Sequence, residues 1–163
     1  MNPSWSQPQV LESLDDSWDR APKTPGVYII SGGRPISRIG GDDRHGILYI
    51  GKARNLRERL WSFWYANHNA SGFLWTNPAL ARIVFHRVIR TVTDVETHLG
   101  RLKYRVSTPI NLRDLDRAER AVLCAYIGRF GEAPPLNHNL PLRWTSTPSA
   151  QDLRWAEGGI LSG

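Results

Sequence analysis

Short apolar runs and longer stretches with helical spacing alternate along the chain. Residues 27–30 and 47–50 are compact runs of aromatic and β-branched side chains, and residues 102–106 alternate between apolar and polar. Runs of this length and composition predict three strands. The link between the first two, residues 31–46, carries five glycines, one proline and three arginines, so we interpret it as a long connection between two antiparallel strands.

A strand-to-helix corner comes after the second run. Gly51 interrupts the run, Asn55 is a good N-cap, and Glu58 three residues later completes a capping-box pattern. Apolar side chains then recur at helical spacing on one face, namely Leu56, Leu60, Phe63 and Trp64. Lys52 directly follows the glycine and Arg59 flanks the apolar stripe, so two cations converge near a helix N-terminus, where anions bind. The alternative is an ordinary solvated helix face.

Helical spacing also predicts helices later in the chain. Residues 79–90 have apolar positions at this spacing, and residues 93–99 suggest one or two further turns. The last long helix is predicted over residues 117–130. Gly131 ends it, and two prolines beyond act as a stop.

The ends of the chain differ in composition from its centre. Residues 1–24 mix Ser, Gln, Pro and Asp, and we expect an arm with a short helix at 11–18 that packs on the domain. Residues 142–163 are polar and rich in Gly, Ser and Pro, and we expect a tail. Residues 25–141 then form the domain itself. The side chains expected to anchor the two ends are Trp5, Trp18 and Trp155.

Size and charge narrow the class of protein. The chain has 163 residues, enough for one domain with a substantial core and short for two. A net charge of +6 and a pI near 10 favour nucleic acid or another polyanion as partner. The alternative is arginine use driven by genome base composition, since only three of the 21 basic residues are lysine.

Signals for other chemistries and compartments are scarce. Cys124 is the only cysteine and lies in an apolar helical pattern, so we expect a buried thiol and no internal disulfide. The five histidines lack metal-type spacing, so no zinc site is expected. Nothing approaches a membrane span or an apolar signal segment, and we expect a cytoplasmic protein without a membrane partner.

Two tripeptides on the first two predicted strands form a pattern with a later arginine. They are Gly26–Val27–Tyr28 and Tyr49–Ile50–Gly51, and Arg59 lies ten residues after the second tyrosine. This pattern resembles the GIY-YIG endonuclease family. Further matching positions are Lys52, Ala53, Asn55 and Leu56. The family expects a later helical glutamate and then an asparagine after a proline; Glu119 and Asn137 are similar to these, so the resemblance spans most of the chain.

The resemblance implies a fold and a reaction. The fold is α+β, with a small central three-stranded antiparallel sheet flanked by helices. The reaction is hydrolysis of DNA phosphodiesters with one divalent metal, Mg²⁺ or Mn²⁺. Glu119 is then the metal ligand, because hard cations prefer oxygen donors. The alternative is a capping box in which Asp116 is the N-cap and Glu119 stabilises the start of the helix.

The resemblance also gives roles to the other matched residues. Tyr28 is a general base or positions the nucleophilic water, and Tyr49 shares that water or orients the phosphate; ordinary strand aromatics are the alternative. Lys52 supplies a charge that lowers a tyrosine pKa or holds the water itself. Arg59 clamps the scissile phosphate. Asn137 braces its loop or the hydrogen bonds on the metal side, and a turn asparagine is the alternative. DNA contacts are expected from Arg34, Arg38, Arg44, Arg54 and Arg57 and from residues 65–100.

The chain departs from the family pattern in three ways. The interval between the two tyrosines is longer than in compact repair and homing members and closer to that of restriction-type members. Phe63 stands where the family often has a tyrosine or histidine. The interval from Glu119 to Asn137 is stretched, so Asn139 is an alternative for the asparagine position.

These observations lead us to expect a metal-dependent DNA endonuclease, with restriction or DNA defence as the leading biological role. A DNA repair or structure-specific nuclease is one alternative. A DNA-binding module of the same fold that does not cut, or a small structural domain whose basic charge is compositional, are others. Cutting both strands at one site would require a homodimer, because one active site cuts one strand at a time.

Overall fold

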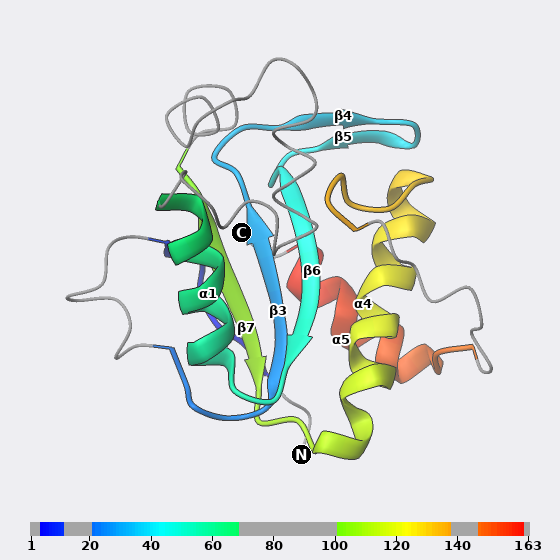
Figure 1. Cartoon of the computed structure of the whole chain (residues 1–163). Coiled ribbons are helices and arrows are strands. Elements are labelled where there is room, and N and C mark those ends of the chain that lie inside the picture. The colour runs from blue at the N-terminus through cyan, green and yellow to red at the C-terminus, as the bar shows by residue number, and fades with distance from the viewer. Residues whose placement is uncertain (1–3, 12–20, 69–100, 138–146, 162–163) are drawn as a thin grey trace.

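A computed structural model describes residues 4–11, 21–68, 101–137 and 147–161, with side chains of the first helix described only to Ser62. The chain folds as α+β around an antiparallel sheet (Figure 1). Its three long strands are β3 (Gly26–Ser31), β6 (Ile47–Ala53) and β7 (Lys103–Thr108), with β3 in the middle. All three strands predicted from the sequence, and the antiparallel pairing of the first two, are confirmed.

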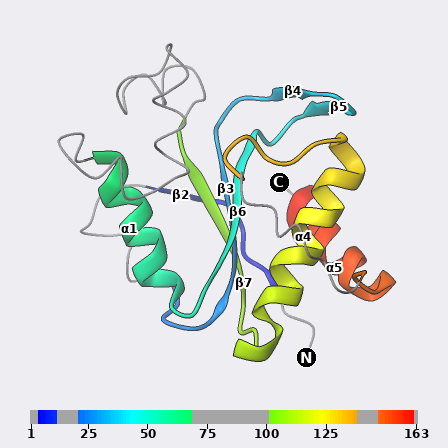
Figure 2. The same ribbon diagram turned by 45° about the vertical axis from the view of Figure 1, so that its right-hand side comes forward.

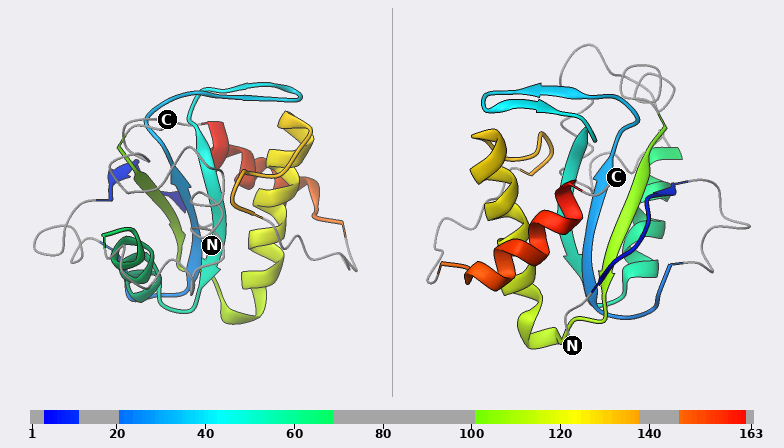
Figure 3. Two further views of the ribbon diagram at one scale, coloured as in Figure 1. Left: turned by 45° about the horizontal axis from the view of Figure 1, so that its top comes forward. Right: turned by 180° about the vertical axis from the view of Figure 1, so that it is seen from behind.

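Further short strands extend this arrangement. β1 (Ser4–Trp5) and β2 (Gln9–Val10) pair with the outer side of β7, as the view from behind shows (Figure 3). Within the predicted connection between β3 and β6, β4 (Ile36–Arg38) and β5 (Gly41–Asp43) form a separate hairpin. The hairpin lies over the end of α4 (Leu115–Phe130), where the Gly40 amide donates to the Phe130 carbonyl at 2.8 Å.

Three α-helices cover the two faces of the sheet in the described part of the chain (Figure 2). α1 (Leu56–His68) lies on one face. α4 (Leu115–Phe130), preceded by the 3-10 turn η3 (Leu112–Asp114), and α5 (Ala150–Leu161) lie on the other.

Local signals at the helix ends behave as the sequence predicts. α1 begins directly after Asn55, whose side-chain oxygen accepts a hydrogen bond from the Glu58 amide at 3.4 Å. α4 ends at Gly131, which takes a left-handed φ of 75° and donates its amide to Ile127. Cys124 on α4 is half-buried rather than buried.

The C-terminal segment differs from the expected tail, because residues 150–161 form the helix α5. Ala156 and Ile160 recur at helical spacing and are buried against α4, but the Gly158–Gly159 pair lowers helix propensity and hides the pattern. Gly159 is required here. A β-carbon at this position would lie 2.3 Å from the ring of Trp5.

Trp5 and Trp155 anchor the two ends of the chain, as expected. Their rings stack with centroids 5.5 Å apart, and the Trp5 indole donates to the Trp155 carbonyl at 3.1 Å. The predicted helix at 11–18 beyond Leu11, Trp18, the helices at 79–90 and 93–99, and Asn139 lie outside the described residues.

Two hydrophobic cores hold the layers together. One, between the sheet and α1, includes Tyr28, Leu56 and Leu60; the other, between the sheet and α4 with α5, includes Ile29 and Tyr126. None of the helices in the described ranges combines the length and apolar character that crossing a bilayer requires.

Candidate functional site at the edge of the sheet

The two predicted tyrosines lie together on the face of the sheet that α1 covers. Tyr28 on β3 is the register partner of Gly51 on β6, and Tyr49 lies two residues earlier on the same face. The tyrosine rings are tilted by 40°, with centroids 5.9 Å apart. A β-carbon on Gly51 would lie 2.7 Å from both rings, so only glycine lets them meet over this strand.

Burial and neighbouring charges set the ionisation of the tyrosine pair. Burial raises the pKa of both phenols, most strongly that of Tyr28. Their shared hydrogen bond raises the pKa of Tyr28 and lowers that of Tyr49. The charge of Glu119 raises the pKa of both, and that of Arg59 lowers it. Both phenols are therefore neutral near pH 7, and Glu119 and Arg59 both lie near enough to influence them.

Lys52 projects from the opposite face of β6, toward α4. Its Nζ lies 2.5 Å from Oε2 of Glu119 and 2.9 Å from Oδ1 of Asp116. Burial favours the neutral amine, but hydrogen bonds and charge from these two carboxylates outweigh it and raise the pKa of Lys52. Lys52 is therefore an ammonium ion, not a free base.

The predicted site residues lie on the two faces of β6, the strand at one edge of the sheet. α1 and α4 lie on opposite faces, but β6 forms one end of the strand order. Glu119 therefore reaches Lys52 and influences the tyrosines over the same strand. Of the five groups expected to meet, Lys52 and Arg59 line one cavity at this edge, whereas the two phenols and the Glu119 carboxylate are not in its lining.

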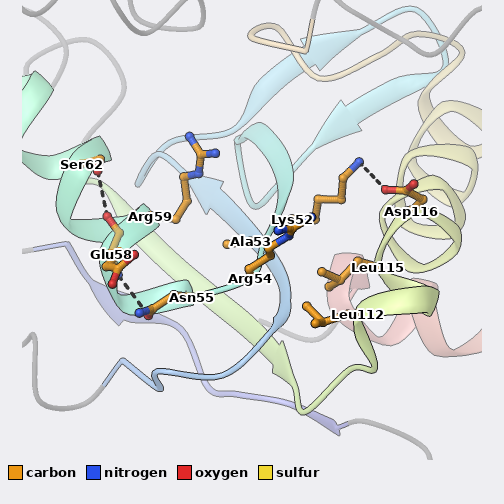
Figure 4. A pocket seen from close by; sticks show the side chains of 10 residues that line it. All are labelled: Lys52, Ala53, Arg54, Asn55, Glu58, Arg59, Ser62, Leu112, Leu115 and Asp116. Atoms are coloured by element: carbon orange, nitrogen blue, oxygen red, sulfur yellow. Dashed lines mark hydrogen bonds and ion pairs between the residues drawn. The ribbon is translucent and has the colours of Figure 1, made fainter.

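A cavity of about 650 Å³ opens beside this edge, between α1 and the start of α4 (Figure 4). Arg59 extends from α1 on one side, and Lys52 reaches across to Asp116 on the other. The cavity is lined by Lys52, Ala53, Arg54, Asn55, Glu58, Arg59, Ser62, Leu112, Leu115 and Asp116. Its volume is in the range of small-molecule and nucleotide sites.

Asn137 braces β6 immediately before the glycine. Its amide oxygen accepts from the Ile50 amide at 2.8 Å, and its amide nitrogen donates to the Ile50 carbonyl at 2.7 Å. The Leu136 amide adds a bond to the Leu48 carbonyl at 2.9 Å. Asn137 thus acts as a one-residue strand partner on the outer side of β6. Of the two roles expected for it, the geometry supports bracing.

The arginines expected to contact DNA divide into two groups. Arg54, Arg34 and Arg44 are exposed, and Arg54 lines the cavity together with Arg59. Arg38 instead bonds the Ala133 carbonyl and lies 3.3 Å from Glu132, with only 9% of its side chain exposed.

Arg57 also has a structural partner, since its Nε donates to the Ala21 carbonyl at 2.8 Å. Arg38 and Arg57 therefore hold the β4–β5 hairpin and the N-terminal segment in position. The spacing of basic residues could not distinguish them from the exposed arginines.

Sequence reasoning missed the role of two aspartates. The sequence pattern suggests Asp116 only as a helix cap, but the N-cap of α4 is Asp114, without a side-chain cap bond, and Asp116 pairs with Lys52. Asp43 is fully buried and accepts bonds from three backbone amides and from the Tyr126 hydroxyl. The available sequence signal for the role of Asp116 was its i, i+3 spacing from Glu119. No sequence signal identified the role of Asp43.

Comparison of the chain with protein-family models, with curated proteins and with solved structures gives no match. Among the residues that the structure describes, no group of three or more His, Cys, Asp or Glu side chains could hold a metal ion. Glu119 is nevertheless suited to a hard cation. Its carboxylate supplies oxygen donors and its side chain is only 17% exposed, although Oε2 is in contact with the Lys52 ammonium. The side chain of Phe63 lies outside the described set.

Proposed function

We propose that the chain is a metal-dependent DNA endonuclease with a GIY-YIG-like fold. The observation that carries the proposal is that Lys52 and Arg59 line one cavity at the β6 edge of the sheet. Glu119 contacts Lys52 there, and the charges of all three act on Tyr49. These residues come from β6, α1 and α4, and their spacing in the sequence follows the motif. Buried hydroxyls with perturbed pKa values beside opposed charges at a cleft are typical of functional sites.

Glu119 would hold the divalent metal, Mg²⁺ or Mn²⁺, through a carboxylate oxygen, with water filling most other positions. When bound, the metal would supply a Lewis acid for a phosphoryl oxygen and stabilise the leaving oxygen. Arg59 extends into the cavity from the opposite side and would grip the scissile phosphate with two N–H donors.

The tyrosines would position the water rather than take its proton. Burial raises the pKa of both phenols, so neither is a phenolate near pH 7. Of the two roles expected for Tyr28, water positioning has the better support.

DNA binding would rest on phosphate contacts from exposed arginines. Arg54 and Arg59 line the cavity, and Arg34 and Arg44 are exposed on the connection between β3 and β6. Such binding weakens steeply with salt, because each phosphate contact releases condensed counterions. The long connection favours restriction or DNA defence over repair as the biological setting.

A DNA-binding module that does not cut is the second candidate. Its support is the ion pair between Lys52 and Glu119, which occupies the carboxylate that the metal would need. Both candidates predict salt-sensitive DNA binding, and only the first predicts strand cleavage.

Nicking of a supercoiled plasmid tests the proposal. Cleavage is expected with Mg²⁺ or Mn²⁺, not with EDTA, and not by Glu119→Ala. Glu157→Ala removes an exposed carboxylate from α5 and is the matched control that should cut normally. Binding without metal-dependent cleavage would support the second candidate, and cleavage that survives Glu119→Ala would refute the role of Glu119.

A further inference from the structure

Lys52 is shared between two carboxylates on the first turns of α4. Asp116 and Glu119 are three residues apart, which puts both side chains on one face of the helix. Nζ of Lys52 lies 2.9 Å from Asp116 and 2.5 Å from Glu119. The surroundings of the two acids differ: the side chain of Asp116 is 77% exposed and that of Glu119 only 17%.

This arrangement conflicts with a metal on Glu119. A divalent ion binds a carboxylate oxygen at about 2.1 Å, so an ammonium on the same group would stand within a few ångströms of it. Two cations at that separation repel strongly where the site is shielded from water. The repulsion favours a metal on Glu119 once the ammonium has moved away from it, and the other partner already in contact with the ammonium is Asp116.

We propose that Asp116 is a positioning residue that takes over the ammonium of Lys52 when a divalent metal binds Glu119. The inference rests on the proposed function, because it assumes that Glu119 is the metal ligand. The metal then replaces the ammonium on Glu119, and in the same step the ammonium pairs with Asp116 alone. Asp116 keeps Lys52 at the rim of the cavity, and the positive charge stays close to where a phosphate would bind.

The rival explanation is that Asp116 is itself a second metal ligand. Both explanations predict weaker metal binding when Asp116 loses its charge. They differ in whether the effect depends on Lys52. If Asp116 acts through the lysine, its substitution matters only while the lysine is present.

A double-mutant cycle on Mn²⁺ affinity separates the two explanations. Mn²⁺ binding to the full chain without DNA is measured by the electron paramagnetic resonance signal of the free ion. Asp116→Asn should weaken binding by a factor of about 5, and Lys52→Met should tighten it roughly 10-fold, as for exposed and partly buried ion pairs. The double variant should match Lys52→Met to within about twofold, the hallmark of coupled sites.

Two further variants control the measurement. Glu58→Gln removes a charge from an exposed residue that lines the same cavity, and should change the affinity by less than about twofold if general electrostatics is minor. Glu119→Gln should abolish the tight site in every background.

The measurements distinguish a failure of the role proposed for Asp116 from a failure of the proposed function. Equal weakening by Asp116→Asn with and without Lys52 overturns the exchange and makes Asp116 a ligand. No weakening in either background overturns it as well. If Glu119→Gln leaves Mn²⁺ binding unchanged, the metal role of Glu119 fails, and with it the proposed function. Asp116 is mostly exposed, so its substitution is not expected to unfold the chain, which thermal melting would verify.

Discussion

Replacing Asn137 with alanine would test whether one side chain holds the edge of the sheet at the site. The amide of Asn137 both accepts from and donates to the backbone of Ile50, at 2.8 and 2.7 Å. Alanine removes both of these hydrogen bonds, and its methyl group can form neither of them. The next residue of β6 is Gly51, over which the tyrosine pair meets, so the loss should reach the site as well.

The expected loss of stability comes from the two hydrogen bonds to Ile50. Each intramolecular hydrogen bond contributes about 1 kcal/mol net, so Asn137→Ala should lower the free energy of unfolding by about 2 kcal/mol. For a chain of this size that corresponds to a fall of roughly 4–8 °C in the melting temperature. Urea denaturation monitored by tryptophan fluorescence would measure it, with plasmid nicking as the functional readout.

Asn137→Asp separates bracing from a role on the metal side. A carboxylate still accepts from the Ile50 amide but faces the Ile50 carbonyl without a proton to donate, so it should be at least as destabilising as alanine. A metal-side role would instead leave Asn137→Asp with normal or stronger metal binding. The control is Asn111→Ala, which removes an exposed asparagine whose side chain makes no cap bond and should cost less than about 0.5 kcal/mol. A cost for Asn137→Ala as small as that of the control would refute the bracing role.

Three further results are expected from the structure. Gly51→Ala forces a β-carbon to within 2.7 Å of the Tyr28 and Tyr49 rings, so it should cost about 1–3 kcal/mol in urea denaturation and abolish cleavage; normal activity would contradict the packing of the pair. Asp43→Ala strips four donors of their buried acceptor and should cost about 3 kcal/mol or more, whereas Asp42→Ala, next to it but exposed, should cost under about 1 kcal/mol. Because the folded pKa values of both tyrosines are raised above 10.0, the unfolded chain ionises first as pH rises, and stability should fall above about pH 10. Ultraviolet difference spectra that show these two tyrosines ionising below pH 10 in the folded protein would contradict the burial argument.

Local patterns predicted the parts of the fold that local physics controls. The three long strands follow from short apolar runs, the start of α1 from Asn55, and the end of α4 from Gly131, because each depends on a few neighbouring residues. The helix α5 was missed because its glycine pair has low helix propensity, and only the packing of Trp5 on Gly159 explains why glycine is there.

The site was predicted less completely than the fold. Spacing in the sequence, together with the family resemblance, pointed to Tyr28, Tyr49 and Glu119. The structure pairs the two tyrosines on one face of the sheet and Glu119 with Lys52 on the other. Spacing could not separate arginines that hold the structure, such as Arg38, from those left exposed, because the partners of Arg38 lie about 95 residues away. The sequence pattern also indicated a helix-capping role for Asp116. Its ion pair with Lys52 was not visible in the pattern, because the two residues lie on elements far apart in the sequence. Nuclease activity, the metal and the DNA partner remain predictions.

The stacking of Trp5 on Trp155 has a consequence for how the chain is made. The two residues are 150 positions apart, and β1 is held between β7 and α5. During synthesis, β1 therefore lacks this neighbour until Trp155 has emerged from the ribosome. Contacts of such long range slow folding. The docking of β1 against α5 should be a late step in folding, and a fusion partner attached close to either element would be expected to delay it.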